Sequence, residues 1–185
     1  MSTSPKINVR EIQVKDIDLI ADYWLTSDAD FLLGMGVDLS KLPTRAALTN
    51  MLTEQINTPL SQKKSYALIW EIDDQPVGHT NVNGIEYGNF ATMHLHLWFS
   101  KNRKKGIGTK LIKKSLPFYF GNLKLKTLFC EPYALNPAPN KTLKKVGFEF
   151  IKKYTTIPGS LNFEQEVNRW EMTKKSFLMT FRNDE

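Results

Sequence analysis

The sequence has a single cysteine and no long hydrophobic run. Cys130 is the only cysteine in 185 residues, so neither a disulfide framework nor a cysteine-based zinc cluster can form. There is no run of about 18 apolar residues, and residues 1–12 lack the charged-then-apolar pattern of a secretion signal. We therefore expect a cytoplasmic protein with no membrane span.

Acidic residues are scarce in one segment. Of the 25 Lys and Arg residues, 14 lie between Lys101 and Lys153, where only Glu131 and Glu149 are acidic. A positive surface of this kind favours a polyanionic ligand, although lysines that merely keep helix surfaces soluble produce the same pattern. Nucleic acid is the weaker interpretation, because the basic residues are not interleaved with aromatics and no helix-turn-helix or zinc pattern occurs.

Hydrophobic periodicity predicts a mixed α+β fold in one domain, residues 1–185, with no internal repeat or linker. Period-two segments predict seven strands, and helical spacing predicts four helices. The predicted strands are 6–13, 65–73, 75–87, 90–100, 125–132, 147–157 and 164–174. The predicted helices are 16–25, 43–56, about 106–120, and 136–146.

One segment combines glycine and lysine at a predicted strand-to-helix junction, with the spacing Arg103-x-x-Gly106-x-Gly108. Paired glycines let the chain turn tightly and expose backbone N–H groups, and a helix N-terminus adds donors and partial positive charge. A pyrophosphate fits such a nest. The glycine spacings of the dinucleotide fingerprint and of the nucleotide P-loop are both absent.

A second pattern about 30 residues later makes the first more specific. Asn136, Leu143, Lys145, Gly147 and Phe148 follow the spacing N-x-x-[SA]-x-x-x-[YL]-x-K-x-G-F. Together the two motifs resemble the GNAT superfamily of acyl-CoA-dependent N-acetyltransferases over roughly residues 75–175. Within it, the chain looks closest to the ribosomal-protein N-terminal acetyltransferase branch. The resemblance implies a mostly antiparallel sheet of about seven strands, flanked by about four helices and splayed between strands four and five.

The resemblance also implies acetyl-CoA as cofactor and assigns residues to it. Backbone amides around Lys104–Thr109 would hold the pyrophosphate, Arg103 would orient that loop, and Lys104 or Lys105 would reach a phosphate oxygen. The end of the preceding strand would bind pantetheine and polarise the thioester carbonyl. Asn136 and Asn140 would contact the cofactor from the other side, although Pro139 replaces the usual small residue there. The cofactor-binding residues are thus Leu97, Trp98, Phe99, Arg103, Lys104, Lys105, Gly106, Ile107, Gly108, Thr109, Asn136 and Asn140.

The reaction implied is direct attack of an amine on the thioester, which needs a proton acceptor and a proton donor. Leu143 stands where many members have a tyrosine acid, so Tyr133 is the substitute candidate. His94 and His96 are the candidate bases, because residues two apart on a strand share a face. Either could instead be a hydrogen-bonded core histidine. With His79 they offer no carboxylate or thiol that would complete a zinc site, so no metal is expected.

Other residues have two interpretations each. Glu131 is a candidate base that could equally pair with a lysine. Cys130 could be a nucleophile, but mid-strand packing is its default. Asn81 and Asn83 could line an acceptor pocket or face solvent, and Trp24, Met35 and Trp170 could wall that pocket or belong to the core.

The sequence does not distinguish between a small amine and a protein N-terminus as the acceptor. Six aspartates in the first 40 residues could attract a cationic amine or only solubilise the surface. They are Asp16, Asp18, Asp22, Asp28, Asp30 and Asp38. The missing tyrosine also leaves open a catalytically impaired acyl-CoA-binding module, and a homodimer stays open too.

Overall fold

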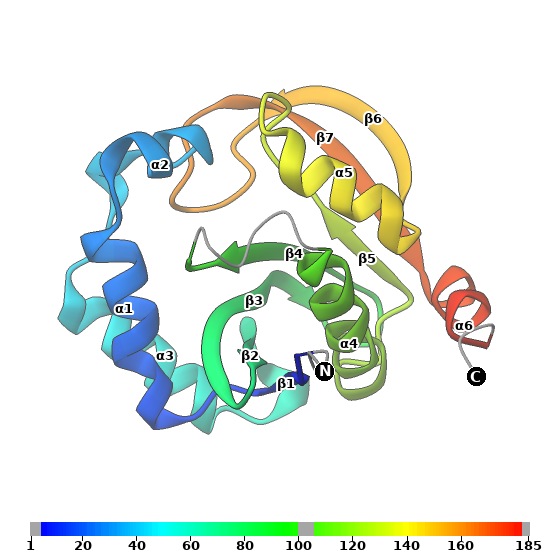
Figure 1. Ribbon diagram of the computed structural model, residues 1–185, viewed down its shortest axis with the longest axis horizontal. Helices are drawn as coiled ribbons and strands as arrows, with labels where there is room; N and C mark the ends of the chain where they lie inside the picture. The colour runs from blue at the N-terminus through cyan, green and yellow to red at the C-terminus, as the bar shows by residue number, and fades with distance from the viewer. Residues whose placement is uncertain (1–4, 100–105, 183–185) are drawn as a thin grey trace.

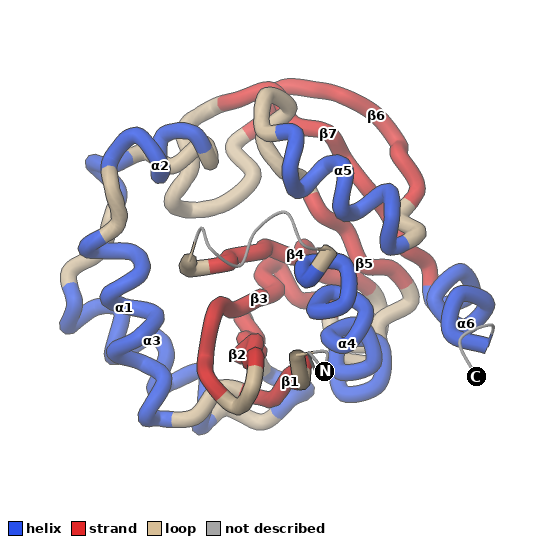
Figure 2. The backbone as a smooth tube through the Cα atoms, viewed as in Figure 1, coloured by secondary structure: helices blue, strands red, loops and turns tan. Residues whose placement is uncertain are grey.

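The computed structural model describes residues 5–99 and 106–182 (Figures 1 and 2). Its strands form one seven-stranded sheet in the order β1-β2-β3-β4-β5-β7-β6. The strands are β1 (Ile7–Glu11), β2 (Ser65–Ile72), β3 (Gln75–Glu86), β4 (Phe90–Leu97), β5 (Thr127–Cys130), β6 (Glu149–Thr156) and β7 (Gln165–Thr173). All neighbouring pairs are antiparallel except β4–β5. The expected mixed, mostly antiparallel sheet is confirmed, whereas a single domain over residues 1–185 stays a prediction.

The described residues contain six α-helices, two more than the sequence predicts. They are α1 (Ile17–Thr26), α2 (Ala29–Gly34), α3 (Arg45–Asn57), α4 (Ile107–Asn122), α5 (Pro137–Val146) and α6 (Lys174–Arg182). Short 3₁₀ turns occur at Val14–Asp16, Leu39–Lys41 and Leu60–Gln62. No helix in this described part of the chain is long and apolar enough to cross a bilayer.

The two additional helices are short and depend on capping hydrogen bonds. The Asp28 carboxylate accepts from the Phe31 N–H at the start of α2. Thr173 Oγ1 accepts from the Ser176 N–H where β7 runs into α6. Such caps satisfy donors that a helix start leaves unpaired, and a hydrophobic-periodicity argument does not register them.

Helices cover both faces of the sheet. On one face, α1 and α3 pack over Ala67 and Ile69 of β2. On the other, the buried side of α4 packs with Leu68 and Trp70 of the same strand. The Asp73–Asp74 turn joins β2 to β3 with φ of 50° and 61°, which is the left-handed geometry of a tight hairpin. Figure 1 shows α1 and α3 on the opposite side of the β2–β3 hairpin from α4.

The sheet opens between β4 and β5, as the resemblance implies. The parallel pairing runs only from Phe90↔Thr127 to Met93↔Cys130, yet β4 continues to Leu97. The β3–β4 pairing is regular from Gly78↔Leu97 to Asn83↔Thr92 and shifts only near the hairpin. A bulge is therefore not what opens the sheet at Leu97, since β5 simply ends at Cys130.

Candidate active site

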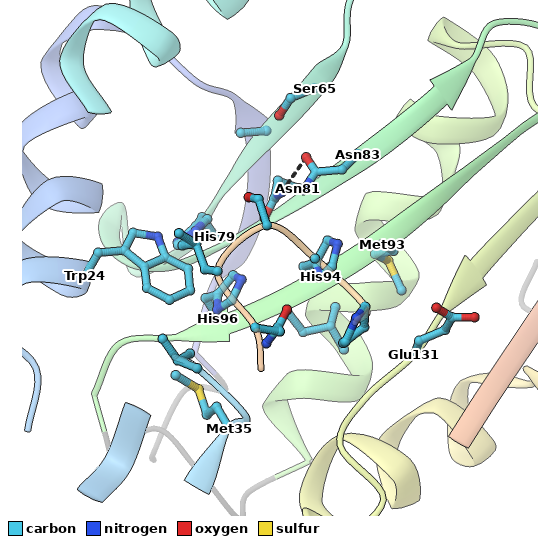
Figure 3. Close-up of a pocket in the computed structure, with 18 of the residues that line it drawn as sticks. Trp24, Met35, Ser65, His79, Asn81, Asn83, Met93, His94, His96 and Glu131 are labelled. Carbon is cyan, nitrogen blue, oxygen red and sulfur yellow. Dashed lines mark hydrogen bonds between the residues drawn. The ribbon is translucent and has the colours of Figure 1, made fainter. Parts of the chain in front are cut away.

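A cavity of about 520 Å³ lies beside this opening, on the face covered by α1 and α3. Its lining comes from α1, α3, the segment after α2, strands β2 to β4, the end of β5, the start of α5 and the β6–β7 loop (Figure 3). Leu95 of β4 and Glu131, which follows β5, both line it. The cavity therefore reaches the gap between the two strands.

Polar side chains on two strands form one wall of the cavity. The antiparallel register pairs His79 with His96 and Asn81 with His94. Residues two apart on a strand share a face, so these four side chains and Asn83 point to the same side of the sheet (Figure 3). Asn81 Nδ2 donates to Asn83 Oδ1 at 3.2 Å.

His79 and His96 are held in an aromatic cluster. Their rings stack with centroids 4.6 Å apart. Trp98 Nε1–H donates to His79 Nδ1 at 2.8 Å, and the Tyr23 hydroxyl lies 3.2 Å from His96 Nδ1. Burial lowers the pKa of His79 to about 3, helped by the charge of His94. Burial and the two neighbouring histidines also hold the pKa of His96 well below its ordinary value. Both rings are therefore neutral at pH 7 and already have a partner.

His94 is in a different position. Its Nε2 is buried and has no hydrogen-bond partner among the described residues, and the ring lines the cavity. Burial lowers the pKa of His94 to about 4, against the opposing effect of Glu131. A neutral imidazole with an unused ring nitrogen can exchange a hydrogen bond or a proton with a ligand.

Glu131 lines the cavity, but its carboxylate is already bound. Oε1 lies 2.7 Å from the Arg169 guanidinium and accepts from the Tyr154 hydroxyl at 2.5 Å. Arg169 in turn stacks on the Phe129 ring at 3.8 Å. The partner of Glu131 is thus an arginine and not a lysine, and this pairing argues against its role as a free base.

Tyr133 also lines the cavity, and no described residue forms a hydrogen bond with its hydroxyl. Asn136 caps α5 by accepting from the Ala138 N–H at 3.3 Å. Asn140 donates to the Tyr133 and Asn136 carbonyls and accepts from Asn168 and Trp170. Because these four bonds use all of its amide capacity, a cofactor contact through Asn140 would have to break one of them.

The hydrogen-bonding direction of each residue in β4 decides which backbone groups face the gap between β4 and β5. The Trp98 N–H donates to the Val77 carbonyl at 2.9 Å, so this residue turns its backbone toward β3. Hydrogen-bonding direction alternates along an antiparallel strand. The N–H groups of Leu95 and Leu97 therefore point toward the side where β5 has ended. Phe99 lies just beyond β4 and is 47% exposed.

The start of α4 lies on the far side of the same opening. Gly106 precedes the helix with φ +70°, and the space around its Cα is open among the described residues. The first N–H groups of a helix have no intrahelical acceptor, which here concerns Ile107, Gly108 and Thr109. A left-handed glycine and N–H donors without an acceptor inside the helix suit a phosphate group. Arg103, Lys104 and Lys105 lie outside the described residues.

The remaining candidate residues named from the sequence either line the cavity or are buried in the core. Trp24 and Met35 line the cavity, whereas Trp170 is buried in the core and donates to Asn140. Cys130 is buried, and burial raises the pKa of its thiol, which disfavours a nucleophilic thiolate. Within the described residues, no three His, Cys, Asp or Glu side chains are grouped to hold a metal ion.

His79 and Gln165 are among the cavity residues that the sequence analysis did not assign to the acceptor pocket. His79 continues the alternation of Asn83 and Asn81, so its place on this wall was predictable. The position of Gln165 could not be predicted from the sequence, because it depends on a long-range contact. Its Nε2 donates to the Gly36 carbonyl, 129 residues earlier, at 2.8 Å. Its Oε1 is the other buried polar atom without a partner in the described chain.

An open parallel strand pair, a helix that starts across the opening and an adjoining cavity together form the arrangement of an acyl-CoA-dependent acyltransferase. Residues 6–149 match the family described as "Acetyltransferase (GNAT) domain". The chain therefore belongs to the GNAT acetyltransferases, which makes acetyl-CoA its acyl donor.

Solved structures of known acetyltransferases share the fold at low sequence identity. Spermidine N-acetyltransferase from Vibrio cholerae, in complex with CoA and spermine, has TM-score 0.75 and 15% identity, with 93% of this chain and 98% of that chain covered. Aminoglycoside acetyltransferase AAC(6')-Ib in complex with coenzyme A has TM-score 0.72 and 16% identity, with 95% and 99% covered. No curated protein matches the sequence of this chain.

Proposed function

We propose that this protein transfers the acetyl group of acetyl-CoA to a primary amine, by direct attack while both are bound. The observation that carries the proposal is the position of His94. The His94 side chain lines a cavity that meets the gap between β4 and β5, and its Nε2 is buried without a partner among the described residues. An amine held in the cavity would meet an acyl group held in the gap.

The cofactor would be bound mainly by backbone. The N–H groups of Ile107, Gly108 and Thr109 would take the pyrophosphate, with Gly106 supplying the turn. Arg103, Lys104 and Lys105 would add attraction to the phosphates, and Asn136 would orient the start of α5 beside the cofactor. The N–H group of Leu95 would donate to the pantetheine arm or to the thioester oxygen, two residues before the strand end at Leu97, Trp98 and Phe99 to which the resemblance assigned this role.

The proton would leave the amine through His94. Acetyl-CoA supplies the acetyl thioester, whose thiol is released when the amide forms. His94 is neutral at pH 7 and a weak base, but an amine nitrogen becomes far more acidic as its bond to carbon forms. An ammonium group has no lone pair, so it must first lose one proton to solvent, and Nε2 can then accept the second proton as the attack proceeds. His96 would position this wall, and the Tyr133 hydroxyl would return a proton to the sulfur.

The impaired acyl-CoA-binding module is the alternative. Leu143, at the usual tyrosine position, is fully buried in the core, so no group on that side chain can reach a sulfur atom. Both functions require acetyl-CoA binding, but only an enzyme releases free thiol faster when an amine is added. Thiol release that depends on amine concentration supports the enzyme, and its absence despite acetyl-CoA binding supports the module.

Cofactor binding at the start of α4 is tested by a pair of glycine variants. Gly106→Val should weaken acetyl-CoA binding in calorimetry by about tenfold or more, because a β-branched residue cannot readily adopt φ +70°. Gly121→Val is the matched control, since Gly121 lies in the last turn of the same helix and also faces open space. Equal affinity in both variants would contradict the assignment of the motif.

A further inference from the structure

The cavity walls contributed by α1 and α3 are apolar except for Gln55, whose amide is bonded to Ser65 and to the Ala67 N–H. α1 provides Ile20 and Trp24, the segment after α2 provides Met35 and Val37, and α3 provides Leu48 and Leu52. Ile20, Val37, Leu48 and Leu52 are each at most 4% exposed. A ligand that fills this side of the cavity removes apolar surface from water, which is favourable only if its own surface there is apolar.

The cavity offers no free negative charge among the described residues. Glu131 is the one acidic side chain in the lining, and its carboxylate is bound by Arg169 and Tyr154. The three lining histidines are neutral at pH 7, since burial lowers the pKa of each. A second or third ammonium group would lose its hydration here without gaining a counter-charge, which is costly.

The aspartates of the first 40 residues do not supply that charge. None of the six lines the cavity. Asp16 is buried against Arg10, while Asp18 and Asp22 pair with Arg45. Asp28 and Asp38 accept from the helix-start N–H groups of Phe31 and Ser40. The side chains in this part of the chain are therefore not arranged to attract a polycation.

Neutral polar groups are present instead. Ser65, Asn81 and Asn83 lie on neighbouring strands along one wall (Figure 3). Gln165, the first residue of β7, is 4% exposed. Its Nε2 donates to the Gly36 and Phe163 carbonyls, which fixes the amide orientation and leaves Oε1 as a buried acceptor without a partner. This oxygen faces Gly36, so the groups that can accept a hydrogen bond from a ligand are those of Asn81 and Asn83, which line the cavity and are only partly buried.

Hydrogen bonds between two distant segments of the chain close one side of the cavity. Asp38 N–H donates to the Leu161 carbonyl, Lys41 Nζ to the Asn162 carbonyl, and Asn162 Nδ2 to the Gly36 carbonyl. These bonds tie the segment after α2 to the β6–β7 loop, which reaches toward α2 in Figure 1. A volume of about 520 Å³ with such a tie suits a small molecule more than an extended peptide.

We propose that the acceptor is a small primary monoamine, in which the reacting nitrogen is the only cationic group and is attached to an apolar body with a hydrogen-bond donor. This inference rests on the proposed acetyltransferase function. It excludes acceptors with several ammonium groups as good substrates, because each further ammonium would be buried without a carboxylate. Tyramine, with an aromatic body and a phenolic O–H, is a probe of this class.

The test compares tyramine, spermidine and a short peptide with a free N-terminus as acceptors at saturating acetyl-CoA. We expect kcat/KM for tyramine to exceed that for spermidine by about tenfold or more, from the cost of burying unpaired ammonium groups. The peptide should be the poorest acceptor. Equal or better turnover of spermidine or of the peptide would overturn the acceptor class while leaving the acetyltransferase function intact.

Asn83→Asp introduces a carboxylate into the cavity with almost no change in shape. It should raise kcat/KM for spermidine relative to tyramine by about tenfold, since a carboxylate pairs with a second ammonium group. Asn50→Asp is the matched control, because Asn50 is exposed on α3 and does not line the cavity. An unchanged ratio in Asn83→Asp would contradict the proposal.

Acetyl-CoA binding, measured by calorimetry on each variant, distinguishes a wrong acceptor class from a wrong acetyltransferase function. Binding of acetyl-CoA without acetylation of any monoamine overturns the acceptor class. Failure to bind acetyl-CoA, together with inert amines, overturns the acetyltransferase proposal and this inference with it.

Discussion

At the scale of single residues, His94 and His96 differ in the partners of their ring nitrogens, although both line the cavity. His96 has the Tyr23 hydroxyl at Nδ1 and is stacked on His79. His94 keeps a buried Nε2 without a partner in the described chain. His94 is therefore the histidine of this pair with a buried nitrogen that still lacks a hydrogen-bond partner in the described chain.

The His94→Gln variant tests this difference. Loss of a general base typically lowers turnover by about 10² to 10⁴, so kcat should fall by at least about 10² while acetyl-CoA affinity stays nearly unchanged. Because the pKa of His94 is about 4, wild-type kcat should decline as the pH falls toward 4, and this acidic limb should be weaker in the variant. The measurement is kcat against pH at saturating amine.

The His96→Gln variant is the control for burial and packing. It removes a neighbouring histidine from the same strand face but not the unpartnered nitrogen, so its kcat should fall much less. If His94→Gln turns over at the wild-type rate across the pH range, the base lies elsewhere.

Single residues also show how far the sequence could predict the site. Alternation along β3 and β4 was enough to place Asn81, Asn83, His94 and His96 on one face. The pairing of Glu131 with Arg169 was not predictable, because it depends on how β5 and β7 pair. The saturation of Asn140 by Asn168 and Trp170 depends on the same part of the sheet.

At the scale of elements, the segment after α2 and the β6–β7 loop are joined through one glycine. Gly36 has φ +83°, and a Cβ at this position would lie 2.1 Å from Gln165 Oε1. The first observation disfavours other residues by backbone strain, and the second means that the Gln165 amide would have to shift from its hydrogen bonds to the Gly36 and Phe163 carbonyls. The sequence alone does not show this contact, because it involves a residue 129 positions away.

Gly36→Ala should therefore destabilise the protein by about 2 kcal/mol or more and raise KM for the amine. Gly34→Ala, two residues earlier, is the matched control because its Cβ would meet nothing within 4 Å among the described residues. Its stability should change by less than about 1 kcal/mol. Urea unfolding midpoints and amine KM values provide the comparison, and similar results for the two variants would contradict the role of this tie.

At the scale of the whole molecule, the sheet and its opening were predictable, and two of the helices were not. The seven strands have strong alternation or apolar runs, and β5 is short because its apolar run is short. By contrast, α2 and α6 depend on the caps at Asp28 and Thr173. The cavity was only partly predictable, because segments far apart in the sequence close it.

The buried histidines predict how stability depends on pH. Burial lowers the pKa of His79 to about 3 and of His94 to about 4, and lowers that of His96 as well. Unfolded histidines titrate near pH 6.5, so below that pH the unfolded chain binds more protons than the folded one. The free energy of unfolding should therefore fall as pH drops from about 6.5 toward 4, by at most about 1.4 kcal/mol per pH unit for each histidine.

Urea unfolding between pH 7.5 and about 4.5, above the range where most carboxylates titrate, measures this dependence. The His79→Gln variant should show a shallower slope, because one titrating group is removed. A free energy of unfolding that stays constant over this range would contradict the burial of the three rings.

The central claim, acetyl transfer from acetyl-CoA to a monoamine, is tested most directly by following thiol release and the acceptor's mass together. We predict that release depends on both acetyl-CoA and tyramine, and that tyramine gains one acetyl group for each thiol released. If the protein binds acetyl-CoA but thiol release is the same with and without amine, and no acetylated amine forms, the claim is wrong.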